Sequence, residues 1–187
     1  MILDATASNR TMWKTKECEH IIYVDVETRL KNKPTIFCDN TKTPFKSQSF
    51  DTIFYDPPHL WETDPEPRPV FPREVKEWNK DDPLISYTYF GWNRYHTRGE
   101  LVTHLHKAAK ELHRILKDDG LLWLKWCEVK IPIENVLGIF GDFAELMRIF
   151  STNPLQTLGE SQTYWIVLSK IKKEWEQGSL AQFVSDD

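Results

Sequence analysis

The sequence predicts an α/β fold built on a doubly wound sheet that is mostly parallel and ends in an antiparallel hairpin. Three observations lead to this prediction. Short segments rich in apolar and β-branched residues alternate with polar connectors in the first third of the chain. A helix with a clear apolar stripe follows, between two such segments. The last two apolar segments follow each other with little helix between them, so we expect them to pair antiparallel.

Composition is that of an ordinary globular protein. The chain has 187 residues, 40% of them hydrophobic, and a formal net charge of -4, which does not suit a strongly basic nucleic-acid binder. Three cysteines far apart in the sequence favour a reducing, cytoplasmic compartment over a disulfide framework. No apolar run reaches the roughly 18 residues of a membrane span, and the first residues lack the basic region of a secretory signal. We expect one domain over 1–175, with an insert at 62–98, and a polar, disordered tail over 176–187.

The first half of the chain contains four predicted strands, each followed by an aspartate. A strand over 1–3 leads into a helix that is capped by Ser8 or Thr11 and runs to about Glu17. Further strands lie over 20–26, 34–38 and 50–55. The carboxyl ends of parallel strands share one edge of a sheet, so one crevice should be lined by Asp4, Asp25, Asp39 and Asp56. A single aspartate of this kind would equally suit a turn or a helix cap.

The second half begins with a proline- and aromatic-rich insert over 62–98, which is typical of a substrate loop or lid. A helix is predicted over 99–117, ended by Asp118-Asp119-Gly120, and a buried strand over 121–126. A mostly helical segment over 132–147, with a break near 138–142, precedes two final strands over 148–151 and 164–169. His104 and His106 face apart on the helix and are interpreted as solvated, so no metal site is predicted.

The strongest local signal is Asp56-Pro57-Pro58, at the end of the fourth strand. Proline cannot donate to a strand ladder, so the strand must stop there. A carboxylate and two rigid backbone carbonyls then lie at the edge where open α/β sheets bind ligands. Fixed acceptors of this kind suit an N–H donor on a substrate, because they need no reorganisation when the chemistry occurs.

From about residue 1 to 170 the chain resembles the class I S-adenosylmethionine-dependent methyltransferases, which have a Rossmann-like sheet. It is most similar to the amino-methyltransferases that act on exocyclic nitrogens of nucleic-acid bases. The stretch 56–59 (Asp-Pro-Pro-His) resembles their Asp-Pro-Pro-(Tyr/Phe/Trp) signature, and residues 38–51 resemble the run that precedes it. Residues 4–11 look like a divergent cofactor loop of the form Asp-Pro-Phe-x-Gly-Ser-Gly-Thr. Two departures are that Ser8 and Arg10 occupy glycine positions of that loop and that His59 replaces the aromatic residue.

The resemblance implies S-adenosylmethionine as the cofactor and assigns roles to these positions. Asp25 would hold the ribose hydroxyls, and Asp39 would accept a hydrogen bond from the adenine amine. The implied cofactor-binding residues are Asp4, Ala5, Thr6, Ser8, Asp25, Val26, Asp39 and Asn40. The implied catalytic residues are Asp56, Pro57, Pro58 and His59. Substrate contacts would come from Trp61, Tyr89, Trp92 and Arg94.

The predicted function is methyl transfer from S-adenosylmethionine to an exocyclic amine of a base, with DNA adenine N6 or cytosine N4 as the first candidates and a nucleic acid as the partner. Asp56 and the Pro57 carbonyl would accept from the amine and free its lone pair, while proximity to the sulfonium methyl does much of the rest. Three alternatives stay open: an RNA base, a protein or small-molecule substrate, and a non-catalytic partner subunit of the same fold.

Overall fold

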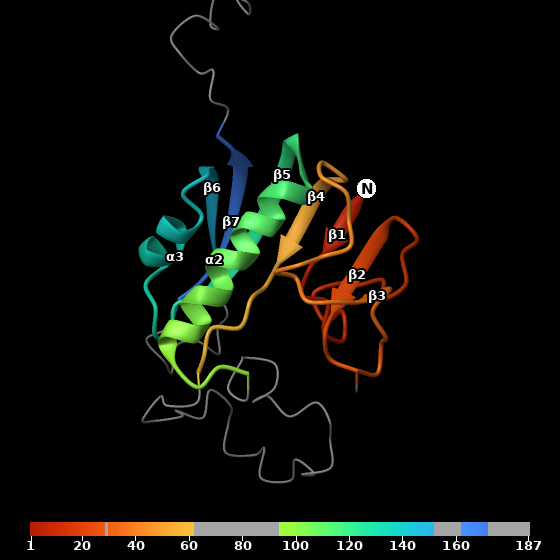
Figure 1. Ribbon diagram of the computed structural model, residues 1–187, viewed down its shortest axis with the longest axis horizontal. Coiled ribbons are helices and arrows are strands. Elements are labelled where there is room, and N and C mark those ends of the chain that lie inside the picture. Colours follow the sequence, from red (N-terminus) through yellow and green to blue (C-terminus); the bar gives the residue numbers. More distant parts are fainter. Residues whose placement is uncertain (29, 62–93, 152–161, 172–187) are drawn as a thin grey trace, which may run out of the picture.

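The computed structural model describes residues 1–28, 30–61, 94–151 and 162–171, which form a seven-stranded sheet in the order β3-β2-β1-β4-β5-β7-β6 (Figure 1). The strands are β1 (Ile2–Asp4), β2 (Ile21–Asp25), β3 (Ile36–Phe37), β4 (Phe50–Tyr55), β5 (Leu116–Cys127), β6 (Phe143–Ser151) and β7 (Thr163–Lys170). Neighbouring strands from β3 to β5 run parallel, whereas β7 pairs antiparallel with both β5 and β6. The predicted fold class, a mostly parallel Rossmann-like sheet with an antiparallel final hairpin, is confirmed.

The long helix α2 (Arg98–Ile115) lies across one face of the sheet (Figure 1). Its first turn is capped by the side chain of Thr97, which accepts a hydrogen bond from the backbone N–H of Glu100, and the Glu100 carboxylate in turn accepts from the His96 N–H at 2.7 Å. Basic side chains occupy the last turn, where they complement the helix dipole. The predicted helix over 99–117 is therefore confirmed, with its end two residues earlier.

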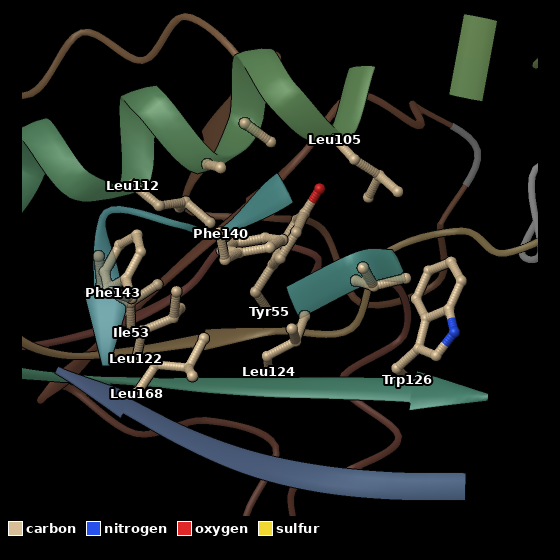
Figure 2. Close-up of a cluster of buried hydrophobic side chains, with 14 of the residues drawn as sticks. Ile53, Tyr55, Leu105, Leu112, Leu122, Leu124, Trp126, Phe140, Phe143 and Leu168 are labelled. Atoms are coloured by element: carbon tan, nitrogen blue, oxygen red, sulfur yellow. The ribbon is translucent and has the colours of Figure 1, made fainter. Parts of the chain in front are cut away.

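The core lies between α2 and the sheet (Figure 2). Alternate residues of β4 and β5 point toward the helix and are fully buried, because side chains of a strand alternate between faces. They are Ile53, Tyr55, Leu122, Leu124 and Trp126. The indole N–H of Trp126 donates to the Ile131 carbonyl at 2.9 Å, so this large side chain buries no unsatisfied donor.

The intervening residues point to the opposite face of the sheet, where they form an aromatic layer. The Phe54 ring stacks on Trp123 with a centroid distance of 5.8 Å and meets Trp13 and Trp165 edge-on, at 5.0 and 6.3 Å. These rings are only partly buried. Residues on the face of the sheet opposite α2 therefore have aromatic neighbours and limited contact with water.

Three local predictions are wrong. Residues 5–20 contain turns and no helix, because Ser8 and Arg10 have positive φ values of 45° and 57°, which interrupt a right-handed helix. The helix α3 (Ile133–Ile139) ends early, and Phe143 to Met147 belong to β6, where pairing with β7 overrides their helix propensity.

The third correction concerns the start of β5. This strand begins at Leu116, directly after α2, and Asp118-Asp119-Gly120 lie in an irregular part of it rather than in a turn between two elements. A Cβ added to Gly120 would lie 2.7 Å from the Leu116 side chain and 3.0 Å from the Asp51 carbonyl. Glycine is therefore required here by the close approach of β4 and not as a helix cap.

None of the helices in the described ranges has the length and apolar character that a membrane crossing requires. Most of the predicted insert and the predicted tail lie outside the described residues, so the single-domain organisation and the role of the insert as a substrate loop stay predictions.

Candidate active site

The four aspartates predicted to share one edge of the sheet do so. Asp4 and Asp25 end β1 and β2, Asp39 follows β3 by two residues, and Asp56 directly follows β4. These strands are consecutive in the sheet and parallel, so their carboxyl ends lie together. The chain passes from β1 outward to β3 and then returns to β4 on the other side of β1. Such a switch in direction opens a crevice at the carboxyl ends of the two flanking strands.

Asp4 organises the loop that follows β1. Its fully buried carboxylate accepts hydrogen bonds from the Trp13 indole at 2.7 Å and from the Thr6 backbone N–H at 3.2 Å. Burial raises the pKa of Asp4 to about 6, and the charges of Asp56 and Asp25 add to this increase. Both carboxylate oxygens are thus engaged by the loop itself.

The loop from Ala5 to Arg10 contains two backbone conformations of the kind that glycine favours. Ser8 and Arg10 both adopt the left-handed conformation, with φ values of 45° and 57°, at the two positions where the resemblance expects glycine. The loop is held to neighbouring strands by backbone bonds from Ala5 to the Phe54 carbonyl at 2.9 Å and from Ala7 to the Val24 carbonyl at 3.0 Å. The glycine-type geometry is therefore kept although the glycines are absent.

Arg10 points away from this loop. Its guanidinium donates to the carbonyls of Lys16 and Lys33, each at 2.5 Å, and lies 3.9 Å from the centre of the Tyr23 ring. Charge-assisted hydrogen bonds and the cation–π contact offset the strain of a side chain at positive φ.

Asp25 clamps the same loop from β2. One carboxylate oxygen accepts from the Ser8 N–H at 2.8 Å, and the other accepts from the Glu27 N–H at 2.9 Å. The neighbouring Val26 is exposed. Asp25 therefore lies where an incoming ligand at the loop would meet it, while it also fixes the loop's conformation.

Asn40 and Ser8 each place a buried polar atom at this loop that lacks a hydrogen-bond partner among the described residues. The Asn40 side chain is 6% exposed and donates to the Ala5 carbonyl at 3.1 Å. Among the described residues, neither its Oδ1 nor the Ser8 hydroxyl has a hydrogen-bond partner. Buried polar atoms without partners are rare in native proteins, so two of them at one loop indicate a place for a ligand or water.

Asp39 is bound by Arg94, which the sequence placed on the substrate side. The two side chains form an ion pair at 2.9 Å, and the Thr41 N–H donates to the other Asp39 oxygen at 2.8 Å. Burial would raise the pKa of Asp39, but the hydrogen bonds from Thr41 and the charge of Arg94 lower it. The Asp39 carboxylate is therefore ionised, and Arg94 lies beside the predicted cofactor residues.

Asp56 lies next to the cofactor loop and forms an ion pair. Its backbone N–H donates to the Thr6 hydroxyl at 2.8 Å, and its Oδ2 accepts from the Lys125 ammonium at 2.6 Å. Burial raises the pKa of Asp56, while the charge and hydrogen bond of Lys125 oppose that increase. Sequence reasoning missed Lys125, although a single charge inside the apolar run of β5 was a usable signal.

His59 is buried, at 9% exposure, and meets the Trp126 ring edge-on at 6.1 Å. Burial and the nearby Lys125 charge lower its pKa to about 4, against the opposing effect of a hydrogen bond to the Pro57 backbone. Because proline has no N–H, the imidazole must donate to the Pro57 carbonyl. The neutral ring thus braces the Asp-Pro-Pro turn from inside.

Two of the predicted catalytic residues, Pro57 and Pro58, are buried and half-buried, respectively. Of the remaining predicted substrate residues, Trp61 packs against the hydrophobic core. Tyr89 and Trp92 lie outside the described residues.

Sequence reasoning also missed a buried polar cluster next to the Asp39–Arg94 pair. His104, interpreted above as solvated, is 8% exposed, and its ring centre lies 5.3 Å from that of Tyr95. The hydroxyls of Tyr55 and Tyr95 and the Nε2 atom of His104 have no hydrogen-bond partner among the described residues. The helical spacing was a usable signal, because His104 lies three residues after Leu101 and four before Ala108, on the apolar stripe of the helix.

Neither a protein-family model nor a curated protein matches the chain, whereas solved structures do. The PH0226 protein of Pyrococcus horikoshii aligns over 91% of this chain and 81% of its own, with a TM-score of 0.53 and 12% identity. The N-methyltransferase NodS of Bradyrhizobium japonicum aligns over 91% and 85%, with a TM-score of 0.51 and 14% identity. The 1,6-didemethyltoxoflavin-N1-methyltransferase of Burkholderia thailandensis, solved with 1,6-didemethyltoxoflavin and S-adenosylhomocysteine, aligns over 91% and 71%, with a TM-score of 0.50 and 12% identity. At such identities the likeness establishes a shared fold.

Proposed function

We propose that this chain is an S-adenosylmethionine-dependent methyltransferase that methylates an exocyclic amine of a nucleic-acid base. One observation carries the proposal: a loop of glycine-type shape, clamped by Asp25, lies directly beside the Asp56 acceptor. The hydrogen bond from the Asp56 N–H to the Thr6 hydroxyl joins the two at 2.8 Å. A methyl-donor site and an amine-acceptor site therefore share one rigid edge of the sheet.

The residues at the loop fit S-adenosylmethionine. Asp25 offers carboxylate oxygens to ribose hydroxyls, and Asp39 offers one to an adenine amine. The unpartnered Asn40 Oδ1 and Ser8 hydroxyl add polar atoms that a ligand at the loop can satisfy. When bound, the cofactor supplies an electrophilic sulfonium methyl group. The solved structure of a fold neighbour with S-adenosylhomocysteine supports the same assignment by analogy.

Asp56 is the group that prepares the amine. An exocyclic amine is a weak nucleophile because its lone pair is delocalised into the ring. A carboxylate that accepts one of its hydrogens favours a pyramidal nitrogen and makes the lone pair available. The Pro57 carbonyl has a second lone pair left beside its bond from His59, and it can accept the other hydrogen. Asp56 then lies within reach of the proton that the nitrogen releases when the new C–N bond forms.

A base must leave its stack to reach this edge, so single-stranded or flipped nucleic acid is the expected substrate. DNA adenine N6 or cytosine N4 is the first choice, and an RNA base is the second. A small nitrogen-containing molecule is the candidate from another class, because the net charge of -4 provides little general attraction for phosphate. Two fold neighbours that are N-methyltransferases, one of them solved with a small-molecule ligand, support this alternative by analogy.

The test is a transfer assay with S-adenosylmethionine labelled in its methyl group. The purified chain is incubated separately with denatured DNA, total RNA, total protein and a set of small aromatic amines, and the D56A variant serves as the control. We expect label in one nucleic-acid pool, recovered as an N-methylated base after digestion. Label in the protein or small-molecule set would overturn the substrate class, and no transfer in any set would overturn the enzymatic assignment.

A further inference from the structure

We propose that Lys125 is a positioning residue that keeps Asp56 ionised and aims it, and that its charge cancels the preference that an unpaired Asp56 carboxylate would have for protonated amines. This inference rests on the proposed function and defines the substrate class of the same site. No motif of the sequence resemblance includes Lys125.

The fold places Lys125 beside Asp56 by strand register. Tyr55 of β4 pairs with Leu124 of β5, so the residues that follow them lie side by side at the carboxyl edge. The Lys125 Nζ atom lies 2.6 Å from the Asp56 Oδ2 atom, and the two side chains are 33% and 32% exposed.

The surroundings of Lys125 distinguish this pair from an ordinary surface ion pair. Leu124 and Trp126, its neighbours in β5, are fully buried on the α2 side of the sheet. On its own side, the Nζ atom lies 5.9 Å from the centre of the Trp165 ring. A long flexible cation held between an aromatic ring and a carboxylate has few alternative positions, so the pair is preorganised.

Lys125 favours the ionised form of the Asp56 carboxylate in surroundings that disfavour it. Burial disfavours the charged form of Asp56, and the Asp56 charge in turn raises the pKa of the fully buried Asp4. His59, the other titratable group at this turn, is neutral and contributes no compensating charge. Lys125 is therefore the cation that keeps Asp56 an acceptor, because a protonated carboxyl group would present a donor to the amine.

Lys125 also determines which oxygen is available. With Oδ2 engaged by the ammonium, Oδ1 can accept a substrate N–H, since no described residue donates a hydrogen bond to it. This carboxylate oxygen and the second lone pair of the Pro57 carbonyl match the two hydrogens of a single NH₂ group.

The same ammonium discriminates between amines by charge. Two like charges about 4 Å apart repel enough to weaken binding roughly fivefold or more. An alkylamine, which is protonated at neutral pH, would bring its charge against Lys125, and this repulsion offsets the attraction of the Asp56 carboxylate for that charge. An aromatic amine on a base is neutral and meets no such repulsion.

The experiment compares K125M with the rescue variant K125R and the matched control K117M. Lys117 and Asp51 form an ion pair at the same 2.6 Å between the same two strands, at their opposite end. The pKa of Asp56 is measured from carboxyl ¹³C shifts, assigned by the loss of one resonance in D56N, and circular dichroism verifies folding. We expect K125M to raise the pKa of Asp56 by about one pH unit or more, and K125R and K117M to leave it near the wild-type value. An unchanged pKa in K125M would overturn the positioning role.

Transfer assays test the consequence for the substrate. In K125M the acidic limb of the pH–rate profile should move to higher pH by the same amount as the Asp56 pKa, so that transfer is lost at acidic pH and recovers at alkaline pH. The rate ratio of an aromatic amine to an alkylamine should also fall. A parallel loss at every pH with an unchanged ratio would contradict the inference. If the wild type transfers no methyl group while the pKa shifts as expected, the positioning role stands and the proposed function fails.

Discussion

Replacing Ser8 with glycine should stabilise the protein, whereas replacing Arg10 with glycine should destabilise it. Both residues hold a left-handed backbone conformation, with φ values of 45° and 57°. Their side chains, however, differ in the contacts that they make. The buried Ser8 hydroxyl has no hydrogen-bond partner among the described residues. The Arg10 guanidinium donates to two carbonyls through its Nη1 and Nη2 atoms and lies over the Tyr23 ring, although its Nε atom has no partner among the described residues.

The magnitudes follow from these contacts. A left-handed L-residue is strained by about 1–2 kcal/mol, which glycine relieves. The greater freedom of glycine in the unfolded chain offsets about 0.4–1 kcal/mol of that gain. Removing the unpaired Ser8 hydroxyl adds about 1 kcal/mol, so S8G should gain roughly 1–2 kcal/mol in free energy of unfolding. R10G relieves the same strain but loses two charge-assisted hydrogen bonds and a cation–π contact, so it should lose about 2 kcal/mol or more.

Urea unfolding followed by tryptophan fluorescence measures both changes, and equal m-values would verify that the two-state treatment holds. The variant S8A separates the two contributions at Ser8, because it removes the hydroxyl and keeps the strained Cβ. Its stability should lie between those of the wild type and S8G. A loss of stability in S8G, or a gain in R10G, would refute the account of how the loop keeps a glycine-type shape without glycine.

Three further predictions concern the cofactor residues and the buried histidines. D25A should weaken S-adenosylmethionine binding at least about tenfold by calorimetry, because the clamp on the loop and the ribose acceptor are lost together; unchanged affinity would move the ribose contact elsewhere. R94M should strengthen that binding up to about fivefold, because adenine then need not displace an ion pair from Asp39, and weaker binding would place Arg94 on the cofactor. Stability should fall as the pH drops from 6.5 toward 4, because the pKa values of His59 and His104 are lowered to about 4 and the unfolded state takes up protons first. Asp4, with its pKa raised to about 6, acts in the opposite direction, so the double variant H59Q/H104Q should reverse the slope, and an unchanged slope would contradict these assignments.

Much of the sheet was predictable because its signals are local. Apolar segments ending in aspartate located β1, β2 and β4, and the parallel arrangement that follows from short strands and one long helix brought the four carboxylates to one edge. The Asp-Pro-Pro stop also needed only local rules, since proline ends a strand wherever it stands.

Other features depend on contacts between distant segments, and a single sequence does not reveal them. The absence of a helix after β1 follows from the Asp4 and Asp25 carboxylates, which draw the Trp13 indole and the Ser8 N–H into turns. The same holds for Phe143 to Met147, whose strand conformation depends on β7. Lys125 could be seen as an unusual charge, but its partner became identifiable only from the register between β4 and β5.

The separation of roles between Asp56 and the cofactor loop is the central claim, and one paired measurement tests it most directly. S-adenosylmethionine affinity by calorimetry and methyl transfer to the responsive nucleic-acid pool are measured on the same preparation of D56A. We predict a dissociation constant within about twofold of the wild type and a transfer rate at least about 100-fold lower, the usual effect of removing one preorganised group from a reacting centre. Equal losses of binding and transfer, or transfer at the wild-type rate, would contradict the claim that Asp56 acts on the amine and the loop on the cofactor.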